Sequence, residues 1–179
     1  SETTYTFADL NPLTQYRLGI KAIDDRENES EITEIDFVML PSDTYNGDIV
    51  LRTQVYIDLL EDHNINTING NLIIGDLSST GLSLNSERIE NIVNLRGITA
   101  INGSLIIGNT EDFSWNSNLN WLDNLNGLQD IETISGNLKI EDTSIQNLDE
   151  FTSLVEIGGD IEIYENSQLN DFCSLSDFF

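Results

Sequence analysis

The chain has 179 residues, of which 39% are hydrophobic and 22% charged, values typical of a folded globular protein rather than a disordered one. Its 32 acidic residues outnumber 7 lysines and arginines, so the formal net charge is −25. Such a surface repels phosphate backbones and anionic lipid, which argues against nucleic-acid binding and membrane-surface binding. It favours plain solubility or, less often, a cationic partner.

Residues 1–40 have the pattern of β-strands joined by polar turns. Alternating apolar residues predict strands at Thr4–Phe7, Tyr16–Ile23 and Glu34–Val38. The stretch Asp24–Ser30 is dense in oxygen ligands and raises the question of structural calcium, but it lacks the spacing of an EF-hand loop. An acidic surface loop is the simpler interpretation, and residues 41–45 are expected to form a linker.

Residues 49–63 are expected to cover the open end of the repeats that follow them in the chain. Ile49–Leu51 is expected to be a capping strand, and Thr53 has the residue type of a helix N-cap. Gln54–His63 then predicts a short amphipathic helix, with apolar residues four apart on one side: Val55 and Leu59, and Tyr56 and Leu60.

Four later segments share the pattern Ile-x-Gly-x-Leu/Ile-x-Ile, around Gly70, Gly103, Gly136 and Gly159. These glycines are 33, 33 and 23 residues apart. After each glycine, apolar residues two apart indicate a short strand with one buried face. Before each of the last three, apolar residues three apart indicate a tight 3₁₀-like return. Glycine supplies a turn that a side chain would obstruct, or one with positive φ.

One such repeat cannot bury its own apolar face, so the repeats are expected to stack and share a core. Leu72, Leu105, Leu138 and Ile161 should then lie one above the other. The predicted fold is mainly β: a parallel β-solenoid with an N-terminal capping helix, preceded by a separate segment of strands. The family resemblances described below imply in addition that the solenoid is right-handed and that the preceding segment is a partial β-sandwich. Asn91, Asn124 and Asn147 share one register, and we expect an asparagine ladder that satisfies backbone groups rather than a row of ligand-binding residues.

Strand alternation predicts three outward rows on the parallel sheet. The first is Ile73, Ile106, Lys139 and Glu162; the second is Asn71, Ser104, Asn137 and Asp160; the third is Gly75, Gly108, Glu141 and Tyr164. Two solvent-facing isoleucines on an acidic surface would mark a contact site. Extra length at Leu77–Arg88 and Asn109–Trp121 predicts projecting loops. Phe113, Trp115 and Trp121 lie in or beside the second loop and would either fold over the isoleucines or stack on sugars.

Signatures of catalysis are scarce. His63 is the single histidine and lies at the end of the predicted helix, which argues against a histidine-based triad. The outward carboxylates Glu141, Asp160 and Glu162 are best explained as a solvated acidic face. We therefore expect no enzyme, no cofactor and no metal site. The one cysteine, Cys173, is expected to be buried or to pair with a cysteine outside this sequence.

Two resemblances add to this interpretation. Residues 1–40 resemble the last three strands of a fibronectin type III domain, through Leu10-Asn-Pro-Leu-Thr-Gln-Tyr16, Ala22-Ile-Asp24 and Asn28-Glu-Ser30. Residues 46–179 resemble the receptor L-domain and its leucine-rich bacterial relatives, through Leu51–Leu60, the four glycine-centred segments and Leu169–Leu175. Leu169, Phe172 and Leu175 resemble the start of another repeat, which implies that the chain continues past Phe179.

The L-domain resemblance implies a non-catalytic recognition or adhesion module, extracellular or on a cell surface, and the likeness to bacterial relatives implies a bacterial source. The expected partner is an extracellular protein or a glycan, bound through the outer face of the sheet and the tryptophan-containing insertion. Two alternatives stay open: a passive spacer that displays another domain, and a glycan-binding accessory module of a polysaccharide-processing system. Neither nucleic acid nor direct membrane insertion is expected.

Overall fold

A computed structural model describes residues 7, 10, 14–38, 43–62, 64–75, 88–108 and 122–179. The chain divides into two compact units, residues 1–41 and 42–179. Within the described residues no helix is both long and apolar enough to cross a membrane.

The first unit contains an antiparallel strand pair, β1 (Gln15–Ile20) and β2 (Thr33–Val38). Tyr16 stacks on Phe37 across the pair, with ring centroids 5.8 Å apart. On the opposite face Arg17 donates two hydrogen bonds to Asp36, of 2.7 and 3.0 Å. The predicted strands around Tyr16 and Phe37 are thus present, while the one predicted at Thr4–Phe7 lies almost wholly outside the described residues.

The second unit is built from two five-stranded parallel sheets. One sheet has the order β11-β9-β7-β5-β3 and the other β12-β10-β8-β6-β4. The strands of the first sheet are β3 (Thr44–Asn46), β5 (Thr67–Asn69), β7 (Ala100–Ile101), β9 (Thr133–Ile134) and β11 (Glu156–Ile157). Those of the second are β4 (Ile49–Leu51), β6 (Leu72–Ile74), β8 (Leu105–Ile107), β10 (Leu138–Glu141) and β12 (Ile161–Tyr164).

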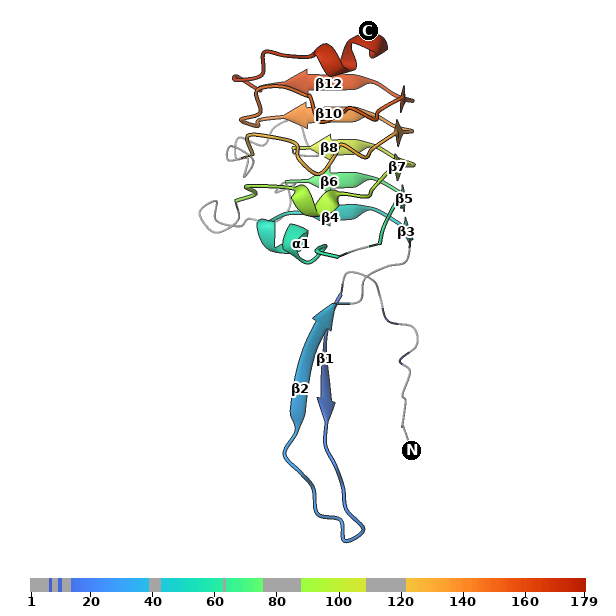
Figure 1. Ribbon diagram of the computed structural model, residues 1–179, viewed down its shortest axis with the longest axis vertical. Helices are drawn as coiled ribbons and strands as arrows, with labels where there is room; N and C mark the ends of the chain where they lie inside the picture. Colours follow the sequence, from blue (N-terminus) through green and yellow to red (C-terminus); the bar gives the residue numbers. More distant parts are fainter. Residues whose placement is uncertain are drawn as a thin grey trace. The chain divides into compact units, whose positions relative to one another are not determined.

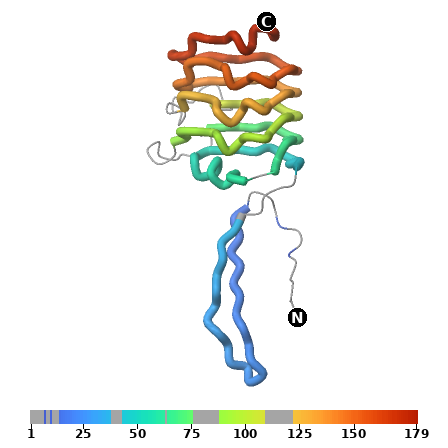
Figure 2. Tube along the Cα trace, in the orientation of Figure 1, coloured from blue at the N-terminus to red at the C-terminus, as the bar shows by residue number. Residues whose placement is uncertain are grey.

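Each consecutive pair, from β3–β4 to β11–β12, gives one strand to each sheet, and we call each pair with its connection a coil. The five coils lie in order in the second unit, as the level strands in Figure 1 and the trace in Figure 2 show. The mainly β fold with parallel strands is as predicted. The strand predicted at Ile49–Leu51 is present as β4. That it belongs to a first coil was missed: Tyr45-Asn-Gly47-Asp-Ile-Val-Leu51 aligns with the next repeat, and Tyr45 stands where the others have isoleucine.

The apolar residues stack in register between the sheets. Leu72 pairs with Leu105, Leu105 with Leu138, and Leu138 with Ile161. The first three of these side chains are fully buried, as are their partners in the other sheet, Ile68, Ile101 and Ile134. Fully burying one such side chain contributes about 1.5–3 kcal/mol, so the repeated stack accounts for much of the driving force of folding.

The third side of each coil returns the chain to the first sheet. Ile89, Ile92, Leu95 and Ile98 are spaced three apart and fully buried, around the 3₁₀ helix η1 (Val93–Leu95). Leu122, Leu125, Leu128 and Ile131 occupy the same places in the next coil and are also fully buried. A second 3₁₀ helix, η2 (Cys173–Phe178), buries Leu175.

The helix α1 (Gln54–Asp58) is shorter than the predicted Gln54–His63. Thr53 occupies the N-cap position but makes no side-chain cap hydrogen bond. The expected apolar stripe is wrong in part. Leu60 is buried as expected, but Val55 and Tyr56 are exposed, and Ile57, which was not in the stripe, is buried. The helix packs against β4 and η1, so the residues that point at those elements decide its apolar side.

Candidate functional site

The outer face of the sheet β4-β6-β8-β10-β12 carries the predicted first row. Its members lie side by side in the order Val50, Ile73, Ile106, Lys139 and Glu162. Strand alternation, with Leu72 and Ile74 pointing inward, fixes this arrangement. The row is therefore a real structural feature, and Val50 extends it by one residue.

The exposure of that row differs from the prediction. Ile73 and Lys139 each expose only 7% of their surface, so the expectation that both face solvent is wrong. Ile73 lies between two further aliphatic side chains, Val50 and Ile106, which shield it laterally. Ile106 is half-buried and Glu162 is exposed. The accessible parts of the face are thus Ile106 on β8 and the outward side chains of β12, with the buried strand β10 between them.

A buried charged cluster explains why Lys139 is hidden. Its ammonium lies 3.1 Å from a carboxylate oxygen of Glu141, and 5.4 Å from the centre of the Tyr164 ring. Glu141 exposes 5% of its surface and Tyr164 exposes 36%. An ammonium that leaves water needs such partners, because burying an unpaired charge is costly. Only the tyrosine of this cluster presents a substantial surface to solvent.

Burial and mutual contacts shift the pKa values of this cluster. Burial lowers the pKa of the Lys139 ammonium, but its hydrogen bonds with Tyr164 and Glu141 and the attraction of the carboxylate raise it more, so the net pKa is above the ordinary value. Burial, followed by a hydrogen bond to Glu141, raises the pKa of the Tyr164 phenol. At neutral pH the lysine is therefore protonated and the tyrosine neutral.

Gly108, the neighbour of Glu141 in the third outward row, leaves space for the Glu141 side chain. A Cβ on Gly108 would lie 3.2 Å from the carboxyl carbon of Glu141, so a side chain there would displace the carboxylate. Gly108 also has a φ of 137°, and Gly75, its counterpart one coil earlier, has a φ of 90°. Both glycines are thus required by backbone conformation where the chain leaves the sheet.

The second row forms a ladder of hydrogen bonds between coils. The backbone N–H of Asn71 donates to Asp48 Oδ1 at 2.7 Å, and that of Ser104 donates to Asn71 Oδ1 at 2.8 Å. Asn137 N–H donates to Ser104 Oγ, and Asp160 N–H to Asn137 Oδ1, both at 3.0 Å. Each coil therefore offers a side-chain oxygen to the backbone of the next one, a structural role for this row.

The glycines of the repeat form a second column beside this ladder. A Cβ on Gly103 would lie 2.6 Å from the carbonyl carbon of Gly70, and a Cβ on Gly136 or Gly159 would lie 2.8 Å from the carbonyl carbon of the glycine before it. Side chains are excluded there by the close approach of stacked backbones. The sequence left open whether these glycines avoid a steric clash or adopt a positive φ, and the close approach of the backbones shows that they avoid a clash.

Asn91, Asn124 and Asn147 do not show the expected ladder. The side chains of Asn124 and Asn147 each accept a hydrogen bond from a backbone N–H two residues later in their own turn. The backbone N–H of Asn91 donates to Gln54 Oε1 at 3.2 Å. The amide ladder lies in the other sheet, where Asn69 donates to Asn46 and Asn102 donates to Asn69, both at 2.7 Å. The sequence signal for it is the asparagine directly before Gly47, Gly70 and Gly103.

The remaining predicted site residues divide into two groups. Phe113, Trp115 and Trp121, and also His63, lie outside the described residues. Cys173 is exposed rather than buried, and its thiol has a raised pKa because it is hydrogen-bonded to the Asp171 carboxylate.

The acidic side chains of the described residues are dispersed or engaged in local contacts. In the described part of the chain, no three His, Cys, Asp or Glu residues gather closely enough to hold a metal ion. The Asp24 carboxylate accepts hydrogen bonds from the backbone N–H groups of Arg26 and Asn28, so it closes its own turn. The Glu141 carboxylate faces Lys139, while Asp160 and Glu162 are exposed.

The comparison with known families gives one match. The family model described as Receptor L domain matches residues 99–172, the part of the chain that holds the third, fourth and fifth coils. Receptor L domains are non-catalytic, typically extracellular modules that bind ligands, which supports a recognition protein rather than an enzyme. No curated protein and no solved structure matched in the corresponding comparisons.

Proposed function

We propose that this chain is a non-catalytic recognition or adhesion module that binds an extracellular protein or a glycan through the outer face of β4-β6-β8-β10-β12. The observation that carries the proposal is the accessible end of that face. There Tyr164 and Glu162 of β12 are exposed beside the buried Lys139–Glu141 pair, and Ile106 is half-buried two strands away on β8. Tyrosine held in one position with an open edge is the kind of anchor that interfaces favour.

The finer features of the module belong to the same proposal. We infer a right-handed solenoid whose first coil is covered by α1, and an insertion with Phe113, Trp115 and Trp121 that adds to the binding face. We also infer that residues 1–40 form the last strands of a fibronectin type III domain and that the module works at a bacterial cell surface. The linker predicted at residues 41–45 must be shorter, because Thr44 and Tyr45 already belong to β3. Support comes from the repeat register, the packing of α1 on β4 and the antiparallel pair β1–β2.

A screen against a glycan array and a pull-down from extracellular protein extracts would supply a ligand for testing the face. Tyr164→Ala and Ile106→Glu should each weaken its binding at least tenfold, and Trp115→Ala should do so if the insertion contributes. Val155→Ser is the matched control, because Val155 exposes 75% of its surface and precedes a strand of the other sheet. Circular dichroism checks that every variant is folded. Unchanged affinity in folded Tyr164→Ala and Ile106→Glu would remove the proposed face.

The alternative is a passive spacer, and one observation favours it. Ile73 and Lys139, on the two strands that flank the central strand β8, are buried, so the accessible area is smaller than the sequence predicted. A spacer would show no ligand in either screen, and Tyr164→Ala would then have no effect beyond stability.

A further inference from the structure

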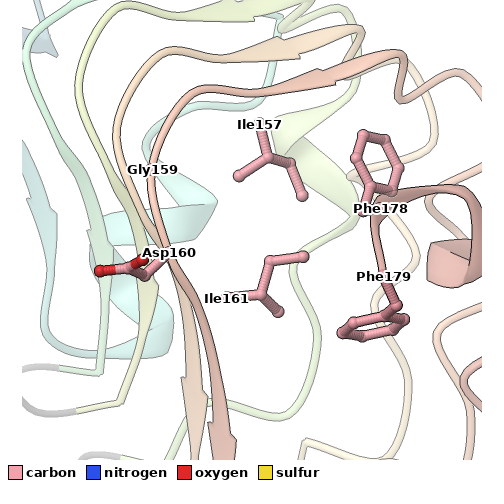
Figure 3. Close-up of a pocket in the computed structure, with 6 residues that line it drawn as sticks. All are labelled: Ile157, Gly159, Asp160, Ile161, Phe178 and Phe179. Carbon is pink, nitrogen blue, oxygen red and sulfur yellow. The ribbon is translucent and has the colours of Figure 1, made fainter.

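The outer face of the sheet β11-β9-β7-β5-β3 is formed by the residues on either side of one inward apolar residue in each strand. Ile68, Ile101 and Ile134 are these inward residues in three successive coils, and all three are fully buried. In the next coil Ile157 takes the same place, and Figure 3 shows it across from the ring of Phe178. Because side chains alternate along a strand, the residues before and after these isoleucines point outward.

The outward residues of the first four coils form two rows of hydroxyl and amide groups. In the order from β3 to β9, the first row is Thr44, Thr67, Ala100 and Thr133, and the second row, two residues later, is Asn46, Asn69, Asn102 and Ser135. All eight side chains are exposed or half-buried. We call these eight residues the neutral grid. Its pattern is threonine, an inward residue and asparagine, with Ala100 and Ser135 as the two variations.

The neutral grid carries no charge in a chain that has 32 acidic residues and a net charge of −25. The outer face of the other sheet, in contrast, carries Lys139, Glu141 and Glu162. Taking a charge out of water costs far more free energy than taking out a hydroxyl or amide that finds a hydrogen-bond partner. The grid is therefore suited to a ligand that is itself neutral and forms hydrogen bonds.

Hydrogen bonds fix the side chains of the grid before any ligand arrives. Asn69 Nδ2 donates to Asn46 Oδ1, and Asn102 Nδ2 donates to Asn69 Oδ1, both at 2.7 Å. An amide has two N–H donors, so Asn69 and Asn102 each keep one for a ligand. The Thr67 hydroxyl donates to Asn66 Oδ1 at 2.9 Å, which leaves its oxygen able to accept. Groups that are already fixed lose little conformational entropy on binding.

The parallel register makes the grid periodic in two directions. Neighbouring strands of a sheet lie about 4.7–4.9 Å apart, and alternate residues of one strand are about 6.4–6.8 Å apart. The same two intervals repeat over four coils, because the strands pair without a shift of register. A ligand that contacts the whole grid must therefore be an extended, regular and neutral array of hydrogen-bond donors and acceptors.

The surface of ice meets these requirements. Each water molecule in ice donates and accepts hydrogen bonds, carries no net charge and has a fixed place in a lattice. The oxygen atoms of that lattice lie in rows whose interval is close to the distance between β-strands. A neutral polysaccharide fits less well, because sugar rings are commonly bound on aromatic side chains. None of the eight residues of the grid is aromatic.

We propose that the neutral grid binds the surface of ice. The hydroxyl and amide groups take part in the hydrogen bonds of the lattice, and the methyl groups of threonine and alanine occupy the spaces between them. The acidic surface elsewhere keeps its own water, so the chain meets ice with this face alone. This function goes beyond recognition of a protein or glycan, and its site lies on the other sheet from the recognition face.

The test grows ice slowly from a seed in a solution of the full chain mixed with serum albumin. A protein that binds ice is taken into the solid, whereas other solutes are excluded. The chain should be enriched in the ice at least tenfold relative to albumin, and a single ice crystal held just below its melting point in the chain's solution should become faceted.

Two variants and a matched control locate the binding on the grid. Thr67→Lys and Ser135→Lys each place a hydrated charge in the grid and should lower the enrichment at least tenfold. Val93→Lys adds the same charge on the 3₁₀ return of the third coil, where Val93 is 37% exposed, and should change the enrichment less than twofold. Circular dichroism checks that each variant is folded.

Three results would overturn the proposal. The first is ice that excludes the unmodified chain as fully as albumin, a result that needs no variant. The second is an equal loss of enrichment in Val93→Lys and the two grid variants, because net charge and not the grid would then determine the enrichment. The third is exclusion from ice together with binding to insoluble cellulose or chitin that Thr67→Lys abolishes, which would assign the grid to a polysaccharide.

Discussion

At the residue scale the glycine column sets the tightest limits. Stacked coils approach so closely at Gly70, Gly103, Gly136 and Gly159 that there is no room for a methyl group. The neighbours in the way are backbone atoms of the adjacent coil, which cannot rotate aside as a side chain can. The spacing of the coils therefore depends on the absence of four Cβ atoms.

Gly103→Ala should lower the free energy of unfolding by about 3 kcal/mol or more, since overpacking of this kind typically costs 1–3 kcal/mol and here the contact is with backbone. Gly97→Ala is the control. Gly97 has a φ of 89° but no atom within 4 Å of an added Cβ, so only the conformational cost of about 1–2 kcal/mol applies. Urea denaturation of both variants measures the difference. Equal losses would mean that the coils are not in close contact.

The buried pair on the outer face gives a second prediction. Lys139→Met leaves the Glu141 carboxylate buried without its ammonium partner, and breaking a buried pair in this way costs about 3–5 kcal/mol. Lys139→Met combined with Glu141→Gln should recover most of that loss, because no unpaired charge then stays buried. Chemical denaturation of the single and double variants tests this, and a double variant as unstable as the single one would contradict it.

The same cluster predicts alkaline sensitivity. Lys139 and Tyr164 both have folded-state pKa values above their ordinary 10.5 and 10.0, so both bind protons more tightly in the folded protein. Their contribution to stability is complete below about pH 10 and is lost as the pH rises through the raised values. Thermal unfolding between neutral pH and pH 11 should show this decline, with a smaller decline in Lys139→Met.

At the element scale the coils are joined by polar ladders as well as by the core. Ser104 contributes a hydroxyl where the neighbouring coils have asparagine, and it accepts the N–H of Asn137 at 3.0 Å. This bond is partly buried, so its loss leaves a backbone donor without a partner.

Ser104→Ala should therefore cost about 1–2 kcal/mol of unfolding free energy, and should speed hydrogen exchange at the Asn137 amide. Ser104→Asn keeps an acceptor at the same place and should change stability by less than about 0.5 kcal/mol. Unaltered exchange at Asn137 in the alanine variant would show that the ladder bond is not formed in solution.

The sequence predicted the elements that repeat and was less reliable for those that do not. The glycine-centred segments and the inward stack from Leu72 to Ile161 follow from periodicity alone, because each coil repeats the same local geometry. The strand Ile49–Leu51 was predicted, but its place in a first coil was not, because Tyr45 breaks the isoleucine pattern of the later repeats. The helix α1 ends early and buries Ile57 because β4 and η1, not its own periodicity, determine its inner side.

Burial on the outer face was equally hard to predict. The alternation of side chains along a strand predicts that Ile73 and Lys139 point outward. It does not predict how far the side chains of adjacent strands cover them. The cluster of Lys139, Glu141 and Tyr164 involves two strands from different repeats, and only their register brings the three side chains together. Asn91, Asn124 and Asn147 share a register without bonding to one another, because an asparagine in a turn can satisfy its own backbone.

At the scale of the whole molecule, a net charge of −25 opposes compaction. Salt screens such repulsion, with a Debye length of about 10 Å at 0.1 M. We expect the thermal midpoint to rise as sodium chloride is increased from about 10 mM to about 500 mM. Differential scanning calorimetry at fixed pH measures this. A midpoint that falls over this range would mean that attractive ion pairs outweigh the repulsion.

The fold and the recognition face both depend on coils that stack in register around one interior. Nuclear Overhauser effects between methyl groups of selectively labelled leucine and isoleucine test this most directly. Leu105 should show cross-peaks to both Leu72 and Leu138, and Leu138 should show one to Ile161, because these are direct neighbours. Leu72 should show none to Ile161, which is three coils away. Missing peaks between direct neighbours, or a strong peak between Leu72 and Ile161, would contradict the stack and the recognition face that it supports.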